Sequence, residues 1–563
     1  MTDGRAPRSA DLSAVAQSAK ADDAKGRAFD ANHPPDPALI DKCVHCGFCL
    51  PSCPTYALWG EEMDSPRGRI YLMKGGLDGR APMSAAFVRH FDACLGCMAC
   101  VTACPSGVQY SPLIEATRGQ IERRYDRSLA DRLFRGAIFA IFPYPARMRL
   151  ALAPLVALQA AGLPFDKLRA SRARRGMQGP RDDRRAALSC LRSPAKRASY
   201  GEARRSAGGA EAAGPPSADR SAKEPVKKYD VERRTRRTRR KTLGISLCGF
   251  RGFCVVRDFF TRSKAVALRP KAIGLRPPGF FRHVRAMMRL APRVTWKSVT
   301  ARVPERTPAV GVKRMTVGVL TGCVQRLVFP NVNTATINVL SAEGCDVVAP
   351  RDQGCCGALS LHAGRLEDAR CFARSTIATF DRAGVDRVAV NAAGCGSSMK
   401  EYGQLLADDP QWAERARAFS ARVRDVTELV IELGEPRATR HPLHLRVAYQ
   451  DACHLAHAQG IRQPPRDLLR SIPGIELLNL PEADMCCGSA GIYNLVEPDT
   501  AEQLGDRKAR LIDSTKPDIV STANPGCTLQ LRAAASRLAR HWPIRHPIEL
   551  LDASLRGVEI SDI

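Results

Sequence analysis

A chain of 563 residues, 44% of them hydrophobic, is long enough for three or four domains with their own cores. Its formal net charge of +29 suggests a nucleic-acid partner, but the charge is concentrated in one segment. Between Asp166 and Arg285 the sequence holds 33 Lys and Arg against 10 Asp and Glu, which leaves only +6 for the other 443 residues. The composition therefore argues against a nucleic-acid partner for the chain as a whole.

The N-terminal residues 1–34 contain no apolar run of the kind that a secretory signal needs, and we expect them to be flexible. The 21 cysteines are grouped rather than scattered. In the reducing cytoplasmic setting that we expect, grouped cysteines bind metal more often than they form disulfides.

Two runs of the form C-x2-C-x2-C-x3-C-P lie within residues 35–125. A cubane [4Fe–4S] cluster is held by four thiolates, and in two-cluster ferredoxins with this run the fourth cysteine ligates the other cluster. The proline fixes φ and lets the chain leave the loop into the next element. The sequence therefore predicts two [4Fe–4S] clusters, the first held by Cys43, Cys46, Cys49 and Cys104 and the second by Cys94, Cys97, Cys100 and Cys53.

The alternative is a pair of zinc sites, but these usually use two separated C-x2-C pairs rather than a triple followed by C-P. His45 lies within the first run, where cysteine already supplies all four ligands, so we interpret it as a polar residue that tunes the cluster by hydrogen bonding. Helical apolar spacing follows Ser65-Pro66 and again Cys104. Residues 35–125 are thus predicted to form a mainly α-helical, two-cluster ferredoxin-like domain.

Residues 126–165 include the most apolar stretch of the chain and are expected to form a helical connector. Pro143, Arg147 and Pro154 divide this stretch into runs well short of the ~20 residues that a spanning helix needs. We expect the connector to cover its own domain. Peripheral contact with a membrane surface, or docking on a partner, is the alternative.

Residues 166–285 are rich in Arg, Ser, Gly, Ala and Pro and show no sustained apolar period. Such a composition cannot bury enough surface to offset the entropy of ordering, so we expect a disordered basic insertion. An RNA- or lipid-binding arm is the alternative, supported only by the run VERRTRRTRR. Cys190, Cys248 and Cys254 lie in this segment without ligand-like spacing and are assigned to no site.

The C-terminal half repeats a C…CCG…C pattern at offsets of 130, 131 and 132 residues, which indicates an internal duplication with domains at 286–440 and 441–555. Strand-like runs alternate with helical patterns, so each copy is predicted to form a parallel α/β sheet with cysteines just past the strand ends. Gly357 and Gly488, which follow the cysteine pairs, permit a positive φ or close backbone approach. The candidate additional metal or redox residues are Cys323, Cys355, Cys356 and Cys395 in the first copy and Cys453, Cys486, Cys487 and Cys527 in the second.

A vicinal disulfide, or simple burial of the paired cysteines, is the alternative for this repeat. Cys345 and Cys371 occur in one copy only and are expected to be core thiols. His454 and His457 follow Cys453, and we expect each to be a hydrogen-bonded loop residue rather than a ligand.

With both patterns in view, the chain resembles the iron–sulfur subunit of bacterial glycolate oxidase (glycolate dehydrogenase) over about residues 35–165 and 285–555. The motifs that carry the resemblance are CVHCGFCLPSCPTYALWGEEMDSPRGRIYLMK, ACPSGVQY, GCVQ, GCCGA, GCGSSMKEYGQLL and CCGSAGIYNL. It implies an α/β protein in which the helical ferredoxin domain is followed by two duplicated α/β CCG domains. Iron–sulfur subunits of L-lactate and glycerol-3-phosphate dehydrogenases and heterodisulfide reductase-like thiol–disulfide enzymes share this layout and stay as alternatives.

The resemblance implies electron transfer rather than substrate chemistry, so we assign no catalytic residue to this chain. FAD-binding partner subunits would oxidise glycolate to glyoxylate, and this chain would pass the electrons toward a membrane quinone or another acceptor from the cytoplasmic face of the inner membrane. The absence of a GxGxxG turn from the sequence agrees with FAD being bound elsewhere. Two features depart from related proteins: no CxxC pair begins at Cys395 or Cys527, and the layout does not require the insertion at 166–285.

Overall fold

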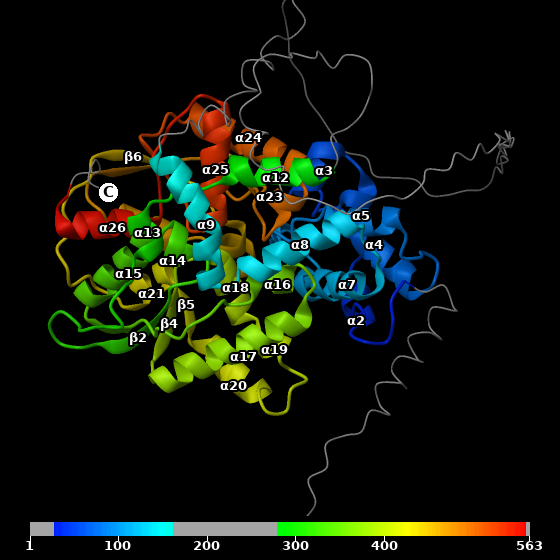
Figure 1. The fold of residues 1–563 in the computed structure, drawn as a ribbon, viewed down its shortest axis with the longest axis horizontal. Coiled ribbons are helices and arrows are strands. Elements are labelled where there is room, and N and C mark those ends of the chain that lie inside the picture. The colour runs from blue at the N-terminus through cyan, green and yellow to red at the C-terminus, as the bar shows by residue number, and fades with distance from the viewer. Residues whose placement is uncertain (1–27, 162–278, 559–563) are drawn as a thin grey trace, which may run out of the picture. The chain divides into compact units, whose positions relative to one another are not determined.

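A computed structural model describes residues 28–161 and 279–558 of the chain (Figure 1). Most of the terminus expected to be flexible and of the insertion expected to be disordered lies outside these residues, as do Cys190, Cys248 and Cys254. Within the described part of the chain, no helix is long and apolar enough to cross a membrane.

Residues 28–125 form helices joined by loops, without a strand, as predicted. The elements are α2 (Pro37–Ile40), α3 (Pro54–Trp59), the 3-10 helix η1 (Glu62–Asp64), α4 (Pro66–Leu77), α5 (Ala85–Asp92), α6 (Ala99–Thr102) and α7 (Tyr110–Arg124). Helix α4 begins at the predicted residue because the Ser65 hydroxyl accepts a hydrogen bond from the Gly68 amide and Pro66 occupies the first helical position. Met73 of α4 and Phe91 of α5 are fully buried in the core that these helices share with α7.

Four further helices flank the undescribed segment, namely α8 (Leu129–Ile141), α9 (Pro145–Ala160), α12 (Gly279–Leu290) and α13 (Trp296–Thr300). Helix α8 contacts α9 and α12, and α9 contacts α13 (Figure 1). One face of α9 packs through Met148, Leu152 and Val156 against Val299 of α13 and Leu327 of the following domain. The apolar stretch therefore forms two helices that each bury one side against the protein.

The first α/β unit contains a five-stranded sheet in the order β1-β3-β2-β4-β5. The strands are β1 (Arg306–Thr307), β2 (Met315–Leu320), β3 (Cys345–Val348), β4 (Arg387–Val390) and β5 (Val423–Asp425). The helices are α14 (Gln325–Val328), α15 (Pro330–Ala342), α16 (Ala358–His362), α17 (Leu366–Ala383), α18 (Ala393–Lys400), α19 (Tyr402–Leu405), α20 (Ala413–Arg422) and α21 (Val426–Glu432). All neighbouring strands are parallel except β1, which pairs antiparallel with β3.

The second α/β unit repeats this topology, with four parallel strands in the order β7-β6-β8-β9. The strands are β6 (Leu445–Tyr449), β7 (Ile475–Leu478), β8 (Ile519–Ser521) and β9 (Ile544–Arg545). The helices are the π-helix η3 (His454–Ala458), α22 (Pro464–Arg470), α23 (Tyr493–Val496), α24 (Pro498–Ser514), α25 (Pro525–Arg537) and α26 (Pro547–Arg556). The order matches β3-β2-β4-β5 strand for strand, so the duplication and the parallel α/β class predicted from the sequence are both confirmed.

The two α/β units share a hydrophobic cluster. Helix α15 of the first unit packs against α26 of the second, and buried side chains such as Val339 and Leu551 belong to the same cluster. Because this cluster includes residues of both units, the cysteine-bearing strand ends of the two units are held in fixed positions relative to each other.

Candidate iron-sulfur and redox site

The first cysteine run forms an exposed loop between α2 and α3. Cys46 is exposed, whereas Cys43 and Cys49 are half-buried. Val44 and Phe48, which flank Cys46, are each 68% exposed. Any group held by this loop therefore lies close to the protein surface.

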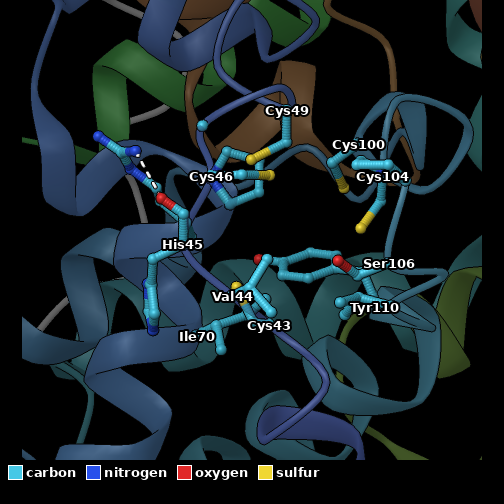
Figure 2. Close-up of a pocket in the computed structure, with 15 residues that line it drawn as sticks. Cys43, Val44, His45, Cys46, Cys49, Ile70, Cys100, Cys104, Ser106 and Tyr110 are labelled. Atoms are coloured by element: carbon cyan, nitrogen blue, oxygen red, sulfur yellow. Dashed lines mark hydrogen bonds between the residues drawn. The ribbon is translucent and has the colours of Figure 1, made fainter. Parts of the chain in front are cut away.

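A pocket brings the first three cysteines of this run together with the second run (Figure 2). Its lining includes Cys43, Cys46 and Cys49 from the first run and Cys100 and Cys104 from the second. Figure 2 shows Cys100, in α6, and Cys104, just after that helix, on the side of the pocket that faces Cys46 and Cys49. The fourth cysteine of the second run thus lies with the first three of the other run.

A second pocket contains the first three cysteines of the second run and the fourth cysteine of the first run. Its cysteines are Cys94, Cys97 and Cys100 from the second run and Cys53 from the first. Cys53 and Cys94 are both buried, and Cys53 immediately precedes Pro54, the first residue of α3. Cys100 lines both pockets, and each pocket contains the four cysteines that the sequence assigns to one [4Fe–4S] cluster.

A buried cation lies beside the second of these sets. Arg69 is 1% exposed, and its Nη1 lies 3.9 Å from the sulfur of Cys53. Burial raises the pKa of Cys97 and of Cys100. Burial also disfavours the Cys94 thiolate, but the guanidinium groups of Arg69 and Arg118 outweigh it and hold the pKa of Cys94 below its ordinary value. This environment favours at least one thiolate in the second set.

His45 has a positive φ of 53° within the first loop. Its carbonyl accepts a hydrogen bond from Arg67 at 2.9 Å, and its ring packs edge-to-face on Tyr71 with centroids 6.2 Å apart. The described contacts of His45 thus fix the shape of the loop.

In the first α/β unit the four candidate cysteines converge past the strand ends. Cys323 follows β2, the pair Cys355-Cys356 follows β3, and Cys395 lies in α18 after β4. The sulfurs of Cys323 and Cys355 are 3.5 Å apart, and the Cys356 and Cys395 thiols are also in contact. Gly357 has a φ of +82°, the left-handed conformation that its position was predicted to permit.

The second α/β unit builds the same set. The sulfurs of Cys453 and Cys486 are 3.9 Å apart, and the thiols of Cys487 and Cys527 are in contact. Hydrogen bonds from neighbouring thiols hold the pKa of Cys453 and of Cys487 well below their ordinary value. Gly488, at a φ of +90°, lies so close to the Ala501 backbone that a Cβ there would stand 2.7 Å from its carbonyl oxygen.

The other cysteines of this half differ from each other. Cys345 is fully buried in β3, as expected of a core thiol, and burial raises its pKa to about 11. Cys371 is exposed on α17, so the expectation of a core thiol is wrong there. Cys371 lies on the solvent-facing side of an amphipathic helix. Its presence in only one of the two copies did not indicate which side of the helix it occupies.

The histidines after Cys453 have different environments. The Nε2 of His457 donates a hydrogen bond to the Asp484 carbonyl (3.0 Å), and its Nδ1 lies 2.8 Å from the Thr102 hydroxyl, which confirms a hydrogen-bonded role. The Nδ1 of His454 lies 3.5 Å from the Cys453 sulfur, and its Nε2 is buried without a partner among the described residues.

Sequence reasoning missed several buried groups that surround His454. The ring of His362, from the first α/β unit, lies 4.7 Å from that of His454, and burial lowers its pKa well below the ordinary value. The Ser111 hydroxyl on α7 lies 3.4 Å from Glu115 and 3.3 Å from Glu401. Burial raises the pKa of both carboxyls. No sequence motif marks this group of buried residues, because they come from three separate parts of the chain.

The second cysteine run packs against the second α/β unit. Cys97 of the second run, Cys453 and Cys486 belong to one buried cluster, and the charge of Cys453 acts on Cys97. The hydrogen bond between Thr102 and His457 ties the same two regions together. The three cysteine sets therefore form a sequence that leads from the exposed first loop, through the second set, to the second α/β unit.

Within residues 28–161 and 279–558, no three His, Cys, Asp or Glu side chains converge closely enough to hold a single metal ion. A cubane has four iron atoms, and its ligands surround it at the corners rather than meeting at one ion. The N-terminal cysteines are spread over two pockets.

Comparison with known families agrees with this geometry. A 4Fe-4S dicluster domain matches residues 39–108, and a cysteine-rich domain matches residues 317–400 and again 447–532. A third model, the linker region of the glycolate oxidase iron-sulfur subunit, matches residues 130–164. The helical two-cluster domain followed by duplicated cysteine-rich α/β domains defines an iron–sulfur protein of the electron-transfer class.

Curated relatives indicate which family within this class the chain resembles. The chain is 31% identical to the probable glycolate oxidase iron-sulfur subunit of Bacillus subtilis, with 94% of each chain covered. It is 29% identical to the glycolate oxidase iron-sulfur subunit of Escherichia coli, over 92% of this chain and 95% of that one. Lactate utilization protein A of Halalkalibacterium halodurans is 29% identical over 44% of this chain and all of its own length. The chain belongs to the family of glycolate oxidase iron-sulfur subunits.

Proposed function

We propose that this chain carries electrons from an FAD-binding partner subunit, which oxidises glycolate to glyoxylate, toward a membrane quinone or another acceptor. The order of the three cysteine sets, from the exposed loop at Cys46 to the buried set at Cys453, is the observation that carries the proposal. Glycolate as the substrate is supported by relatives that are named as glycolate oxidase subunits and that match this chain over almost their whole length.

The ligands that we propose for the first [4Fe–4S] cluster are Cys43, Cys46, Cys49 and Cys104, and those for the second are Cys94, Cys97, Cys100 and Cys53. Such clusters accept one electron at a time, which suits the stepwise release of the two electrons that a flavin takes from a hydroxy acid. The protein would supply the thiolates, the buried charge of Arg69 and the exclusion of water around the second set.

The exposed first loop is the entry side of this path. Val44 and Phe48 present apolar surface on both sides of the exposed Cys46, as a surface that docks a redox partner does. The second set is buried, so electrons that enter at the first loop pass inward toward Cys453.

The cysteine set of the second α/β unit would hold a further redox centre, either a metal or iron–sulfur group or a thiol pair. The convergence of all four thiols past the strand ends favours a heterodisulfide reductase-like thiol–disulfide enzyme as the second candidate function. Iron and acid-labile sulfide analysis separates the two, because two cubanes alone contain about eight irons and clearly more would place iron in the α/β units.

Co-purification from the native host tests the leading function. We expect an FAD-containing subunit to travel with this chain and the preparation to reduce a dye with glycolate in preference to L-lactate or glycerol 3-phosphate. Preference for lactate or glycerol 3-phosphate would instead assign the chain to the corresponding dehydrogenase complex. A preparation with no flavoprotein and no dye reduction by any of the three substrates would refute the proposal.

A further inference from the structure

The outer faces of α8 and α9 are apolar, although each helix already buries its opposite face. On α9, Leu150 is 78% exposed and Leu158 is 41% exposed, and the small apolar residues between them on that face are exposed as well. On α8, Leu129 and Leu133 are 67% and 64% exposed. A surface helix normally turns polar residues outward, so these faces lack the composition expected for contact with water.

Neighbouring helices extend this apolar surface. Tyr144, at the junction of α8 and α9, is 41% exposed, and Trp296 of the adjoining α13 is 54% exposed (Figure 1). We refer to Leu129, Leu133, Tyr144, Leu150, Leu158 and Trp296 together as the connector surface. Leu, Tyr and Trp are the side chains that insert at the boundary between lipid headgroups and acyl chains.

Most charged residues around the connector surface are basic. Residues 132–161 contain four Lys and Arg, residues 279–304 contain six, and neither stretch contains an Asp or Glu. Acidic residues make up 57 of the 563 residues of the chain, so their absence from both stretches is a local feature. Arg147, for example, lies 4.3 Å over the ring of Tyr144 at the middle of the surface. Asp131 of α8 is the acidic residue between Leu129 and Leu133, and it pairs with Arg135 at 3.1 Å. Apolar groups with this excess of basic residues match the surface of an anionic bilayer.

We propose that the connector surface binds the anionic surface of a lipid bilayer, with its leucines and aromatic rings in the headgroup layer and its arginines at lipid phosphates. The proposal concerns a membrane contact and stands whether or not glycolate is the substrate.

Vesicle flotation of the full-length holoprotein tests the proposal. We expect flotation with vesicles of mixed phosphatidylglycerol and phosphatidylcholine but not with phosphatidylcholine alone. At raised ionic strength, where exposed charges are screened, Leu150→Glu and Leu158→Glu should each weaken the remaining binding about tenfold or more. Val312→Glu is the matched control, because Val312 is 79% exposed but lies on a loop outside the connector surface. Unchanged iron–sulfur absorption shows that each variant is folded.

A fluorescence measurement locates the contact directly. Leu150→Trp should give emission that brominated phosphatidylglycerol vesicles quench, whereas Val312→Trp should add no quenching. The proposal is overturned if the wild-type protein does not bind anionic vesicles, or if the Leu150→Glu variant binds them as strongly as the wild type does. It is also overturned if Leu150→Glu releases a co-purified subunit while vesicle binding is kept, since the surface is then a protein interface.

Discussion

The Nη1 atom of Arg69 lies 3.9 Å from the sulfur of Cys53, in the buried core of the N-terminal domain. Its Nη2 donates to the Thr55 hydroxyl at 3.2 Å and to the Asp64 carboxylate at 3.4 Å. Although burial disfavours the cation, the negative charges of Cys94, Cys53 and Asp64 raise the pKa of Arg69, which therefore stays charged. A fixed positive charge at this position stabilises extra negative charge on the second cysteine set.

Replacement of Arg69 is expected to lower the reduction potential of the second cluster. In Arg69→Met the reduced, more negative cluster loses a nearby cation, and we expect a drop on the order of 50 mV, or about 1 kcal/mol for a one-electron couple. Arg69→Lys keeps the charge and should shift the potential less. A redox titration followed by EPR measures both clusters in one sample.

Arg67 supplies the matched control for Arg69. It is partly exposed and donates to the His45 carbonyl on the first loop, so Arg67→Met should leave the second cluster unchanged. Equal shifts of both clusters in Arg69→Met would mean a general loss of structure and would contradict the assigned role.

The crossed ligation predicts reciprocal effects of the two fourth cysteines. Because Cys53 lies in the pocket of the second run, Cys53→Ser should alter or abolish mainly the EPR signal of the second cluster. Cys104→Ser should affect mainly the first cluster, since Cys104 lies with Cys43, Cys46 and Cys49. The opposite pattern, in which each substitution affects the cluster of its own run, would disprove the crossed assignment.

The duplication provides a control for the role of the second α/β unit. Cys453 and Cys323 occupy equivalent positions in the two copies, and Cys453 belongs to a buried cluster with Cys97 that does not include Cys323. Cys453→Ser should therefore change the potential or the relaxation of the second cluster, whereas Cys323→Ser should not. If both substitutions leave the second cluster unchanged, the proposed path from Cys97 to Cys453 is wrong.

Much of this architecture is local enough to be predicted from the sequence. The apolar runs that precede Cys323 and Cys453 form β2 and β6, because short apolar runs in a pattern that alternates with helices favour buried strands. The spacing of the two N-terminal runs likewise restricts which thiols can surround one cluster, and the ligand assignment based on it stays a prediction.

The remaining features depend on contacts between distant parts of the chain. His362 and His454 come from different α/β units, and their contact depends on how the two units pack. Arg69 lies in a helix whose sequence pattern does not mark it as buried, and its burial follows from partners at Thr55 and Asp64. Sequence periodicity reports which face of one element is apolar, but it does not report which buried polar groups meet across elements.

The buried His546 is expected to make stability depend on pH. Its Nδ1 accepts a hydrogen bond from the Ile548 amide at 3.1 Å and so caps α26, and burial lowers its pKa from 6.5 to about 3. Above pH ~6.5 the imidazole is neutral in both folded and unfolded states, so it has no effect there. As the pH falls from ~6.5 toward 3, the unfolded chain takes up a proton that the folded protein cannot hold, and stability falls by up to about 1.4 kcal/mol per pH unit.

His546→Asn should reduce this loss, because asparagine can cap the helix without titrating. We expect the difference in unfolding free energy between variant and wild type to grow in favour of the variant from pH 7 to pH 5.5, as measured by urea unfolding followed by circular dichroism. Measuring the difference at each pH cancels the contribution of other titrating groups that both proteins share. A difference that stays constant over this range would show that His546 takes up its proton equally in the folded and unfolded states.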